Sequence, residues 1–310
     1  NAYRKYLGRL HRSICLVCTM SLINSGFVGV DKRFAKSGVY GLRKHRQERS
    51  LGNFKSIVHS SGGGLNDELA YPGGIWTNSN FKVSVQPLFH FDGSILDGVS
   101  ADNNPSNGTA VSAWGDRSGQ STDYDASQAV ASKQPVFQGT YLDFDGSNDN
   151  LALANTYNNA NGSGWTLCFV AYKDGNTNFG PIGKNLSNST YVSPLNYASG
   201  TTYFLDVSNA SVSVDGYGPH FNSIQQFVTQ KDTSNVVTYY LQGGNSYKSF
   251  TYSYAISNLF SHLGHNGYYH NGRIYELIVW NSTLSTADLN VVRTYFNNKY
   301  TSLPSSTAFS

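Results

Sequence analysis

Acidic and amide side chains crowd one short stretch of the chain. Residues 143–150 read DFDGSNDN, which places Asp143, Asp145 and Asp149 in one tight segment. Oxygen ligands at such spacing suit Ca²⁺, although the stretch lacks the closing Glu of an EF-hand loop. Gly146 would permit a tight reversal in which the aspartates accept backbone N–H groups. The sequence therefore favours a structural turn and no cofactor, with calcium at the three aspartates as the alternative.

Three histidines form a second group that could bind a metal ion. His262, His265 and His270 lie within nine residues, and imidazoles are common zinc ligands. No Asp, Glu or Cys stands close by, and the Leu-Gly and Asn-Gly pairs in this segment indicate a strand, a turn and a second strand. We therefore expect histidines exposed on a loop rather than a zinc site.

Hydrolysis of glycosidic bonds is the third kind of chemistry to test. Retaining glycosidases need two carboxylates about 5–5.5 Å apart, one as nucleophile and one as acid and base. Glu276 is the one Glu between residues 81 and 303, and its segment, RIYELIVW (273–280), contains no second acid. The sequence therefore predicts that the protein is not an enzyme.

Tyrosine-rich loops carry the remaining binding chemistry. They read PLNYAS (194–199), DGYGPHF (215–221) and NGYYHNG (266–272). An aromatic face can stack on the apolar side of a sugar ring while Asn, Asp and backbone groups bind its hydroxyls. Tyr is also favoured at subunit contacts, so both uses stay open. The candidate glycan-binding residues are Tyr197, Tyr217, His220, Tyr268, Tyr269 and His270.

The composition predicts that the scaffold for these groups is built of strands. Charged residues are 13% of the chain and aromatic residues 14%, with 31 Gly and 22 Tyr, whereas Glu is nearly absent. Short apolar or alternating runs recur at the spacing of a β-sandwich. The expected strands are 83–92, 109–116, 134–145, 150–154, 165–173, 179–184, 190–196, 201–208, 211–215, 224–230, 235–242, 247–254 and 273–280.

One helix is expected, near the end of the sequence. Ser285 is placed as its N-cap, and Asp288, three residues later, completes a capping-box spacing. Leu284 and Leu289 flank the cap as a hydrophobic staple. Apolar residues then recur at helical spacing. The pattern predicts a helix over residues 285–299 that lies on the outside of the sandwich with one face down.

Charge divides the chain into two regions. Residues 1–55 carry twelve Lys and Arg against two acids, a net charge of +10. The other residues carry ten Lys and Arg against seventeen acids, a net charge of −7. We expect a basic N-terminal arm (1–55), a Gly/Ser-rich linker (56–80), a β-sandwich (81–303) and a short tail (304–310).

The basic arm is expected to anchor the protein to a neighbour. A segment of this composition does not fold alone, so it must dock on an acidic or apolar protein surface, and contact with nucleic acid is the less favoured alternative. The apolar segment 14–30 is too rich in Ser, Asn and Gly for a membrane span. The pair Cys15 and Cys18 lacks the second pair of a zinc site. The anchoring residues are Arg33, Lys36, Arg43, Lys44, Arg46 and Arg49.

Three blocks of the chain resemble a known family. They read GTAVSAWGDRSGQSTDYDASQAVASKQPVF (108–137), YLDFDGSNDNLAL (141–153) and HLGHNGYYHNGRIYELIVWNSTLSTADLNVVRTYFNNKY (262–300). In this order they are similar to the concanavalin A-like, laminin-G-like jelly-roll domains of bacterial surface proteins and phage structural proteins. The resemblance implies an all-β jelly-roll β-sandwich with one C-terminal helix, here preceded by the extended basic N-terminal arm. It also implies binding of glycans or of other proteins.

The resemblance and the charge division together predict a non-enzymatic structural or adhesive protein of a large assembly, such as a phage or virus particle. Its partners would be other structural proteins, copies of itself and a cell-surface glycan, and its location would be the virion. The alternative is a free-standing secreted or cell-surface carbohydrate-binding module.

Overall fold

The computed structural model describes the chain from residue 77 onward, with gaps. The chain divides into two units, Asn1–Pro72 and Gly73–Ser310, and every described residue belongs to the second. The expected anchoring residues of the basic arm therefore lie outside the described residues. The structure describes residues 77–78, 81–98, 103–159, 163–175, 179–185, 191–193, 196–198, 201–203, 206–207, 222–241, 246–251, 260–265 and 268–309.

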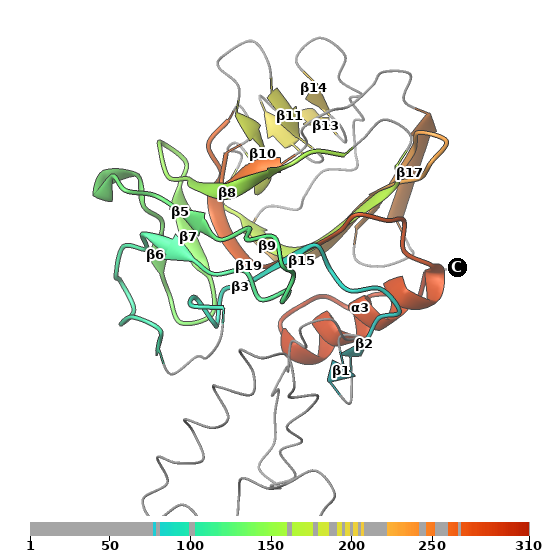
Figure 1. The fold of residues 1–310 in the computed structure, drawn as a ribbon, viewed down its shortest axis with the longest axis horizontal. Coiled ribbons are helices and arrows are strands. Elements are labelled where there is room, and N and C mark those ends of the chain that lie inside the picture. The colour runs from blue at the N-terminus through green and yellow to red at the C-terminus, as the bar shows by residue number, and fades with distance from the viewer. Residues whose placement is uncertain are drawn as a thin grey trace, which may run out of the picture. The chain divides into compact units, whose positions relative to one another are not determined.

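Two antiparallel sheets and one α-helix dominate the described residues (Figure 1). The first sheet has seven strands, in the order β14 (Asp206–Val207), β11 (Tyr191–Ser193), β10 (Ile182–Asn185), β18 (Phe260–Leu263), β8 (Leu151–Tyr157), β5 (Ala126–Ser127) and β4 (Ala113–Trp114). The second has eight, in the order β17 (Ser246–Thr251), β16 (Val236–Leu241), β15 (Ile224–Lys231), β9 (Trp165–Lys173), β19 (Asn271–Trp280), β7 (Leu142–Asp145) and β6 (Val136–Phe137), with β3 (Phe89–Asp92) also beside β19. The fold is an all-β sandwich, as the composition predicts.

Three short elements complete the described structure. Two of them are separate two-stranded pairings, and the third is a single turn of 3₁₀-helix between β5 and β6. They are β1 (Thr77–Asn78) with β2 (Phe81–Lys82), β12 (Asn196–Ala198) with β13 (Thr201–Tyr203), and η2 (Ala131–Lys133).

Strand β9, WTLCFVAYK, is the central strand of the second sheet. It pairs with β15 along one edge and with β19 along the other. Leu167 and Phe169 point into the core between the two sheets, where Phe169 stacks on Phe227 with ring centroids 4.7 Å apart. Cys168 and Val170 point into a second apolar cluster on the other face of the sheet. The continuous apolar run in the sequence therefore marks a strand that is buried on both faces.

The strand predictions fail mainly at turns. The expected strand 134–145 is broken by a turn in which Gly139 has a φ of +83°, and it becomes β6 and β7. The expected strand 83–92 shrinks to β3, and the expected strand 211–215 lies outside the described residues. Strand β18, FSHL, is missing from the strands expected on alternation because it is short, polar in its middle and interrupted by a register shift, although it is the first strand of the strand, turn and strand expected around Leu263–Gly264.

A β-bulge in β19 decides which side chains face the helix. The pairing of β19 with β9 shifts register between Ile274 and Glu276. In a regular strand Ile274 and Glu276, two positions apart, would share a face, but here Tyr275 is an extra, bulged residue between them. With it, Ile274 points into the core between the sheets, while Glu276 and Ile278 point to the opposite face. The bulge therefore turns a carboxylate away from the apolar core.

Helix α3 (Thr286–Lys299) lies on the outer face of the second sheet (Figure 1). Ser285 is its N-cap, and the Ser285 hydroxyl accepts the Asp288 N–H at 3.1 Å. Leu284 and Leu289 are both buried in the apolar cluster beneath the helix. The predicted cap, staple and downward apolar face are confirmed. The Asp288 carboxylate also accepts the N–H and hydroxyl of Ser84 at 2.8 and 2.7 Å, which fixes the chain before β3 to the start of the helix.

Replacing the cap tests how much the helix start contributes to stability. Ser285→Ala removes the oxygen that accepts the Asp288 N–H, so we expect a loss of about 1 kcal/mol in the free energy of unfolding. Urea denaturation of the full chain measures it, with Ser302→Ala, a change at an exposed serine beyond the helix, as the control. Equal midpoints for the two variants would contradict a cap at Ser285.

Candidate functional site

The structure places the expected glycan-binding residues in different regions. Tyr217 and His220 lie outside the described residues, and Tyr197 is described through its backbone, which lies in β12. The other three lie together in the loop before β19: Tyr268, Tyr269 and His270.

His270 is completely buried beneath this loop. Its Nδ1 accepts the Gly180 N–H at 3.4 Å, and its ring packs edge-on against Phe144 and Phe179. Burial lowers the pKa of His270 to about 3, so the imidazole is neutral at physiological pH. The expectation that His270 contacts a glycan is therefore corrected, because the ring supports the loop from below.

The other two histidines also differ from the expected exposed pair. His265 is 6% exposed because its ring stacks on Tyr269, with centroids 4.3 Å apart. His262 is half-buried and shares a hydrogen bond with Ser261. Burial lowers the pKa of both, that of His265 to about 4. The prediction of exposed histidines is wrong for His265 and His270, since Tyr269 of the same loop covers His265 and the distant Phe144 and Phe179 pack on His270.

The acidic stretch forms a turn whose carboxylates hold backbone groups. Asp145 Oδ1 accepts the N–H groups of Ser147 and Asn148 at 2.8 and 3.2 Å. Asp149 Oδ2 accepts the N–H of Asp145 at 3.0 Å. Burial, together with the charges of Asp145 and Asp143, raises the pKa of Asp149 to about 6. These contacts are those of the expected structural turn, and calcium binding here stays a prediction.

The acidic turn and the tyrosine loop meet at one end of the sandwich. Asp145 pairs with Asn271, the first residue of β19. Gly146 lies so close to Asn271 that a Cβ on the glycine would come within 2.6 Å of the Asn271 Cβ. Residues 143–149 therefore meet residues 262–265 and 268–271 at one end of the sandwich, which we call the acidic–aromatic end.

A second constellation, which sequence reasoning misses, lies under α3. The ligand-type atoms of His90, Asp92 and Glu276 all fall within 4.8 Å of one another. Asp92 lies directly opposite Glu276 in the pairing of β3 with β19. The alternation in FHFD (89–92) contains the signal, because it puts His90 and Asp92 on the face opposite to the two phenylalanines.

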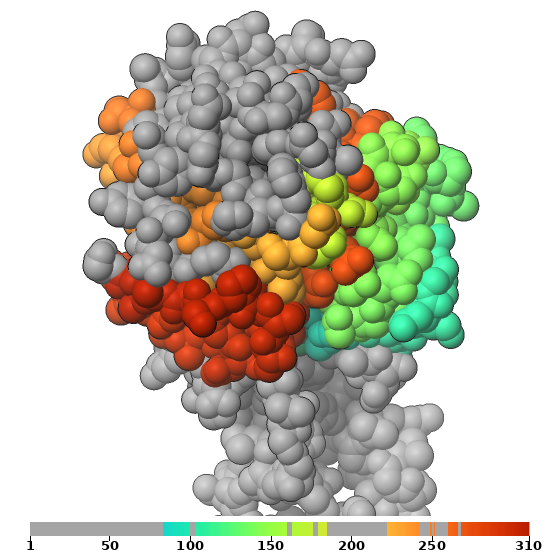
Figure 2. Space-filling model, turned by 180° about the vertical axis from the view of Figure 1, so that it is seen from behind, coloured from blue at the N-terminus to red at the C-terminus, as the bar shows by residue number. Residues whose placement is uncertain are grey.

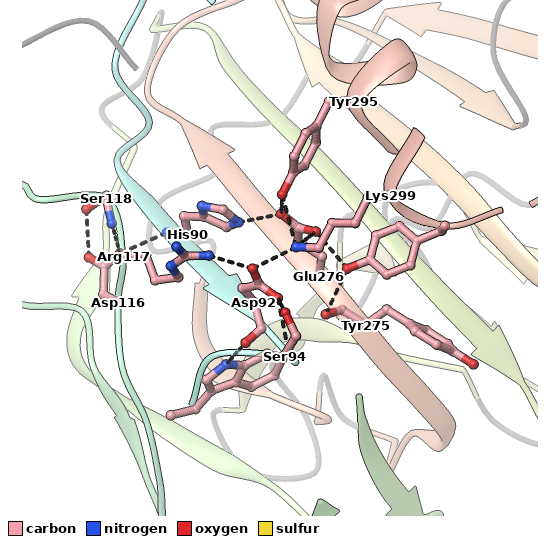
Figure 3. Close-up of polar contacts among 12 residues, drawn as sticks. His90, Asp92, Ser94, Asp116, Arg117, Ser118, Tyr275, Glu276, Tyr295 and Lys299 are labelled. Atoms are coloured by element: carbon pink, nitrogen blue, oxygen red, sulfur yellow. Dashed lines mark hydrogen bonds and ion pairs between the residues drawn. The ribbon is translucent and has the colours of Figure 1, made fainter. Parts of the chain in front are cut away.

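Cations and tyrosines of the chain itself engage these carboxylates (Figure 3). Lys299 Nζ donates to Asp92 Oδ2 at 2.6 Å and to Glu276 Oε2 at 2.8 Å. Arg117 forms an ion pair with Asp92. His90 Nε2 lies 2.6 Å from Glu276 Oε1. Glu276 also accepts hydrogen bonds from two hydroxyl groups, that of Tyr295 in α3 at 2.8 Å and that of Tyr300, the C-cap residue of the helix, at 2.7 Å.

His90, Asp92, Arg117, Glu276 and Lys299 form a buried network of ion pairs and hydrogen bonds that joins α3 to the second sheet, and we call this network the lock. Asp92 and Glu276 are fully buried, and burial alone would raise the pKa of each carboxyl group. Attraction to Lys299, together with the smaller contributions of Arg117 and His90 at Asp92 and of His90 at Glu276, outweighs burial and lowers both pKa values. Two carboxylates thus face two cations. The Lys299 ammonium bridges both carboxylates, where a metal ion would need to lie, so the donor set does not fit a metal.

Solved structures with a similar fold are found at low sequence identity. A sialidase from Trypanosoma rangeli is 12% identical with a TM-score of 0.48, and the match covers 71% of this chain and 34% of the sialidase chain. A botulinum neurotoxin serotype D ligand-binding domain, in complex with N-acetylneuraminic acid, is 12% identical with a TM-score of 0.44, and the match covers 68% and 51%. The chain thus spans about a third to a half of these solved chains. No protein-family model matches the chain, and no curated protein does.

The prediction that the protein is not an enzyme is contradicted by this comparison, since the sialidases among these structures are enzymes. At these identities and TM-scores the likeness itself assigns no activity to the chain. The sequence argument also has a physical error. It finds no second acid on the strand of Glu276, whereas the neighbouring strand supplies Asp92 directly opposite.

The described residues include no helix that is long and apolar enough to cross a membrane.

Removing the bridging cation tests the lock. Lys299→Met leaves two facing buried carboxylates with one remaining cation, so we expect a loss of about 3–5 kcal/mol in unfolding free energy at pH 7. Urea unfolding measures it, with Lys133→Met, at an exposed lysine, as the control. A loss no larger than that of the control would refute the lock.

Lys299→Met should also reverse the pH dependence of the unfolding free energy. In the wild type the pKa values of Asp92 and Glu276 lie below their ordinary values of 3.8 and 4.5. Their stabilisation is therefore present above about pH 4.5 and is lost as the pH falls through the folded-state values. In Lys299→Met, protonation relieves the repulsion, so its deficit relative to wild type should shrink from pH 7 to pH 5.

Asp149→Asn distinguishes the turn from a calcium site. Because its folded pKa is raised, Asp149 stabilises the fold at low pH, and this contribution is lost as the pH rises through about 6. The Asn oxygen can still accept the Asp145 N–H without a charge. We expect the variant to melt at a higher temperature than wild type at pH 8. Millimolar Ca²⁺ that raised the melting temperature of the wild type, and not of the variant, would instead establish calcium binding.

Proposed function

We propose that the β-sandwich is a carbohydrate-binding domain, and that its glycan binds at the acidic–aromatic end. The observation that carries this proposal is the meeting of the acidic turn and the tyrosine loop, which are separated by more than a hundred residues in the sequence and joined by the pairing of Asp145 with Asn271.

The groups at this end have the chemistry that a neutral sugar requires. Tyr268 and Tyr269 are half-buried, so each ring keeps an exposed part, and stacking on His265 holds the Tyr269 ring in place. Asp145 is exposed at the end of β7. Aromatic surface pairs with the apolar side of a pyranose, and carboxylate or amide oxygens accept its hydroxyls. A ring that is already fixed loses little freedom on binding.

The wider setting is also part of the proposal. The three sequence blocks, the two-sheet sandwich and the closing strand and helix together support a concanavalin A-like, laminin-G-like jelly roll. A domain of this type, joined to a basic arm of net charge +10, suits a structural or adhesive protein of a large assembly such as a phage or virus particle. The arm would anchor it there, and the acidic–aromatic end would bind the cell-surface glycan.

A glycan array probed with the full chain tests the proposal. We expect a defined set of glycans to bind, and Tyr268→Ala to weaken the selected glycan by about tenfold, equivalent to 1.4 kcal/mol. Tyr268→Phe keeps the ring and should retain most of the affinity. Surface plasmon resonance with the selected glycan measures both variants.

Two results would count against the proposal. A glycan bound with equal affinity by wild type, Tyr268→Ala and Tyr269→Ala would place the site elsewhere on the sandwich. If no glycan on the array bound the protein, the proposal of carbohydrate binding would be wrong. Circular dichroism of each variant must show the wild-type sheet signal, so that a loss of binding is not a loss of fold.

A further inference from the structure

The segment after α3 turns back and docks on the helix. Phe309 is 6% exposed and belongs to the apolar cluster beneath α3. Its ring meets Tyr240 of β16 edge-on, with centroids 4.9 Å apart. The residues that connect it to the helix are mostly exposed, Thr301, Ser302, Pro304 and Ser305 among them. An aromatic anchor therefore sits at the far end of a connection that is mostly exposed, apart from Leu303, which packs against the same cluster.

The outward face of α3 binds the backbone of this segment. Asn290 contacts both backbone groups of Phe309: its Nδ2 donates to the carbonyl at 3.1 Å, and its Oδ1 accepts the N–H at 2.8 Å. Arg293 Nη1 donates to the Ser306 carbonyl at 3.1 Å, and Asn297 Nδ2 donates to the Ser306 hydroxyl at 2.6 Å. Residues 290, 293 and 297 lie at helical spacing, so they form one row.

This row, with Tyr240, has the properties of a peptide-recognition surface. Asn290 pairs with the backbone whatever the side chains are, while the apolar cluster selects an aromatic ring and Arg293 and Asn297 select a small hydroxyl three residues before it. The sequence that fits is Ser-x-x-Phe in an extended conformation. In Figure 2 the red residues, which include α3 and the segment after it, lie at the surface of the face shown.

We propose that this surface binds the same segment, residues 304–309, of a second copy of the chain. A segment exchanged between two chains makes on the partner chain the same contacts that it makes on its own chain. Exchange therefore changes only the path of the connecting residues. The hinge is the connection of residues 301–305, whose side chains other than Leu303 are exposed. Covalent attachment presents the segment to the surface of its own chain at an effective concentration in the millimolar range, when the link is short and flexible. Exchange therefore competes only where copies are held at a comparable local concentration, as in the assembly of the proposed function. The proposal does not depend on glycan binding.

Two complementary variants of the full chain test the exchange. Phe309→Ala leaves the recognition surface intact and removes its own anchor. Asn290→Ala keeps the anchor and weakens the surface. We expect an equimolar mixture to form a heterodimer, detected by energy transfer between chains labelled with donor and acceptor dyes. Each variant alone should give no such signal. A mixture whose signal equals that of the separate samples overturns the proposal.

A peptide measures the recognition directly. A fluorescein-labelled peptide of residues 301–309 should bind the Phe309→Ala chain saturably in an anisotropy titration. The same peptide with Phe309→Ala should bind at least about tenfold more weakly, because the buried ring provides the anchor. Adding Asn290→Ala to the chain should weaken binding, whereas adding Asn298→Ala, at an exposed asparagine of the same helix, should leave it unchanged. Equal binding of the two peptides would overturn the proposal.

A folding defect in a variant does not end the test. In that case the labelled peptide is added to the wild-type chain, where it must compete with the resident segment. Slow, saturable binding that unlabelled peptide displaces supports exchange, and absence of binding at millimolar peptide overturns it.

Discussion

The sandwich depends on the neutralisation of two carboxylates that its own β-pairing forces together. Asp92 and Glu276 are opposite each other on β3 and β19 and have no access to water. Two buried charges of one sign at this distance are strongly unfavourable unless each is paired. Lys299 bridges them from α3, and Arg117 reaches Asp92 from the loop after β4. The helix, two strands and a loop are therefore held in one arrangement, because displacement of any of them leaves a buried charge without its partner.

The bulge at Tyr275 makes this arrangement possible within a single strand. Before the bulge, Ile274 of β19 points into the apolar core, and after it the Glu276 side chain points toward α3. The first part of the strand, at Asn271, joins the acidic turn. One strand thus carries both the lock and an edge of the acidic–aromatic end. A strand paired on both sides would suit the proposed glycan site, since side chains that are already fixed lose less freedom when a ligand binds.

Local patterns in the sequence predict what local physics determines. The all-β class, the doubly buried strand 165–173 and the capped helix with its apolar face follow from alternation, composition and the spacing of Ser285 and Asp288. Pairing between distant segments does not follow. Asp92 and Glu276 are 184 positions apart, so an argument confined to the strand of Glu276 finds a lone acid. The burial of His265 and His270 likewise depends on Tyr269, Phe144 and Phe179, two of them distant in sequence. The tyrosine loop and the acidic turn are each visible in the sequence, and their meeting is not.

The two surfaces proposed for binding lie on or beside elements that the lock fixes. The proposed glycan site lies in the loop just before β19 and at the end of β7, while the proposed segment-binding row lies on α3, whose last residue is Lys299. Since Lys299 ties α3 to the centre of β19, strain from a partner bound along the helix would reach the sheet through paired charges rather than through loops. A helix held by apolar contacts alone could slide, whereas moving the ammonium away from two buried carboxylates has a high energetic cost at the first step.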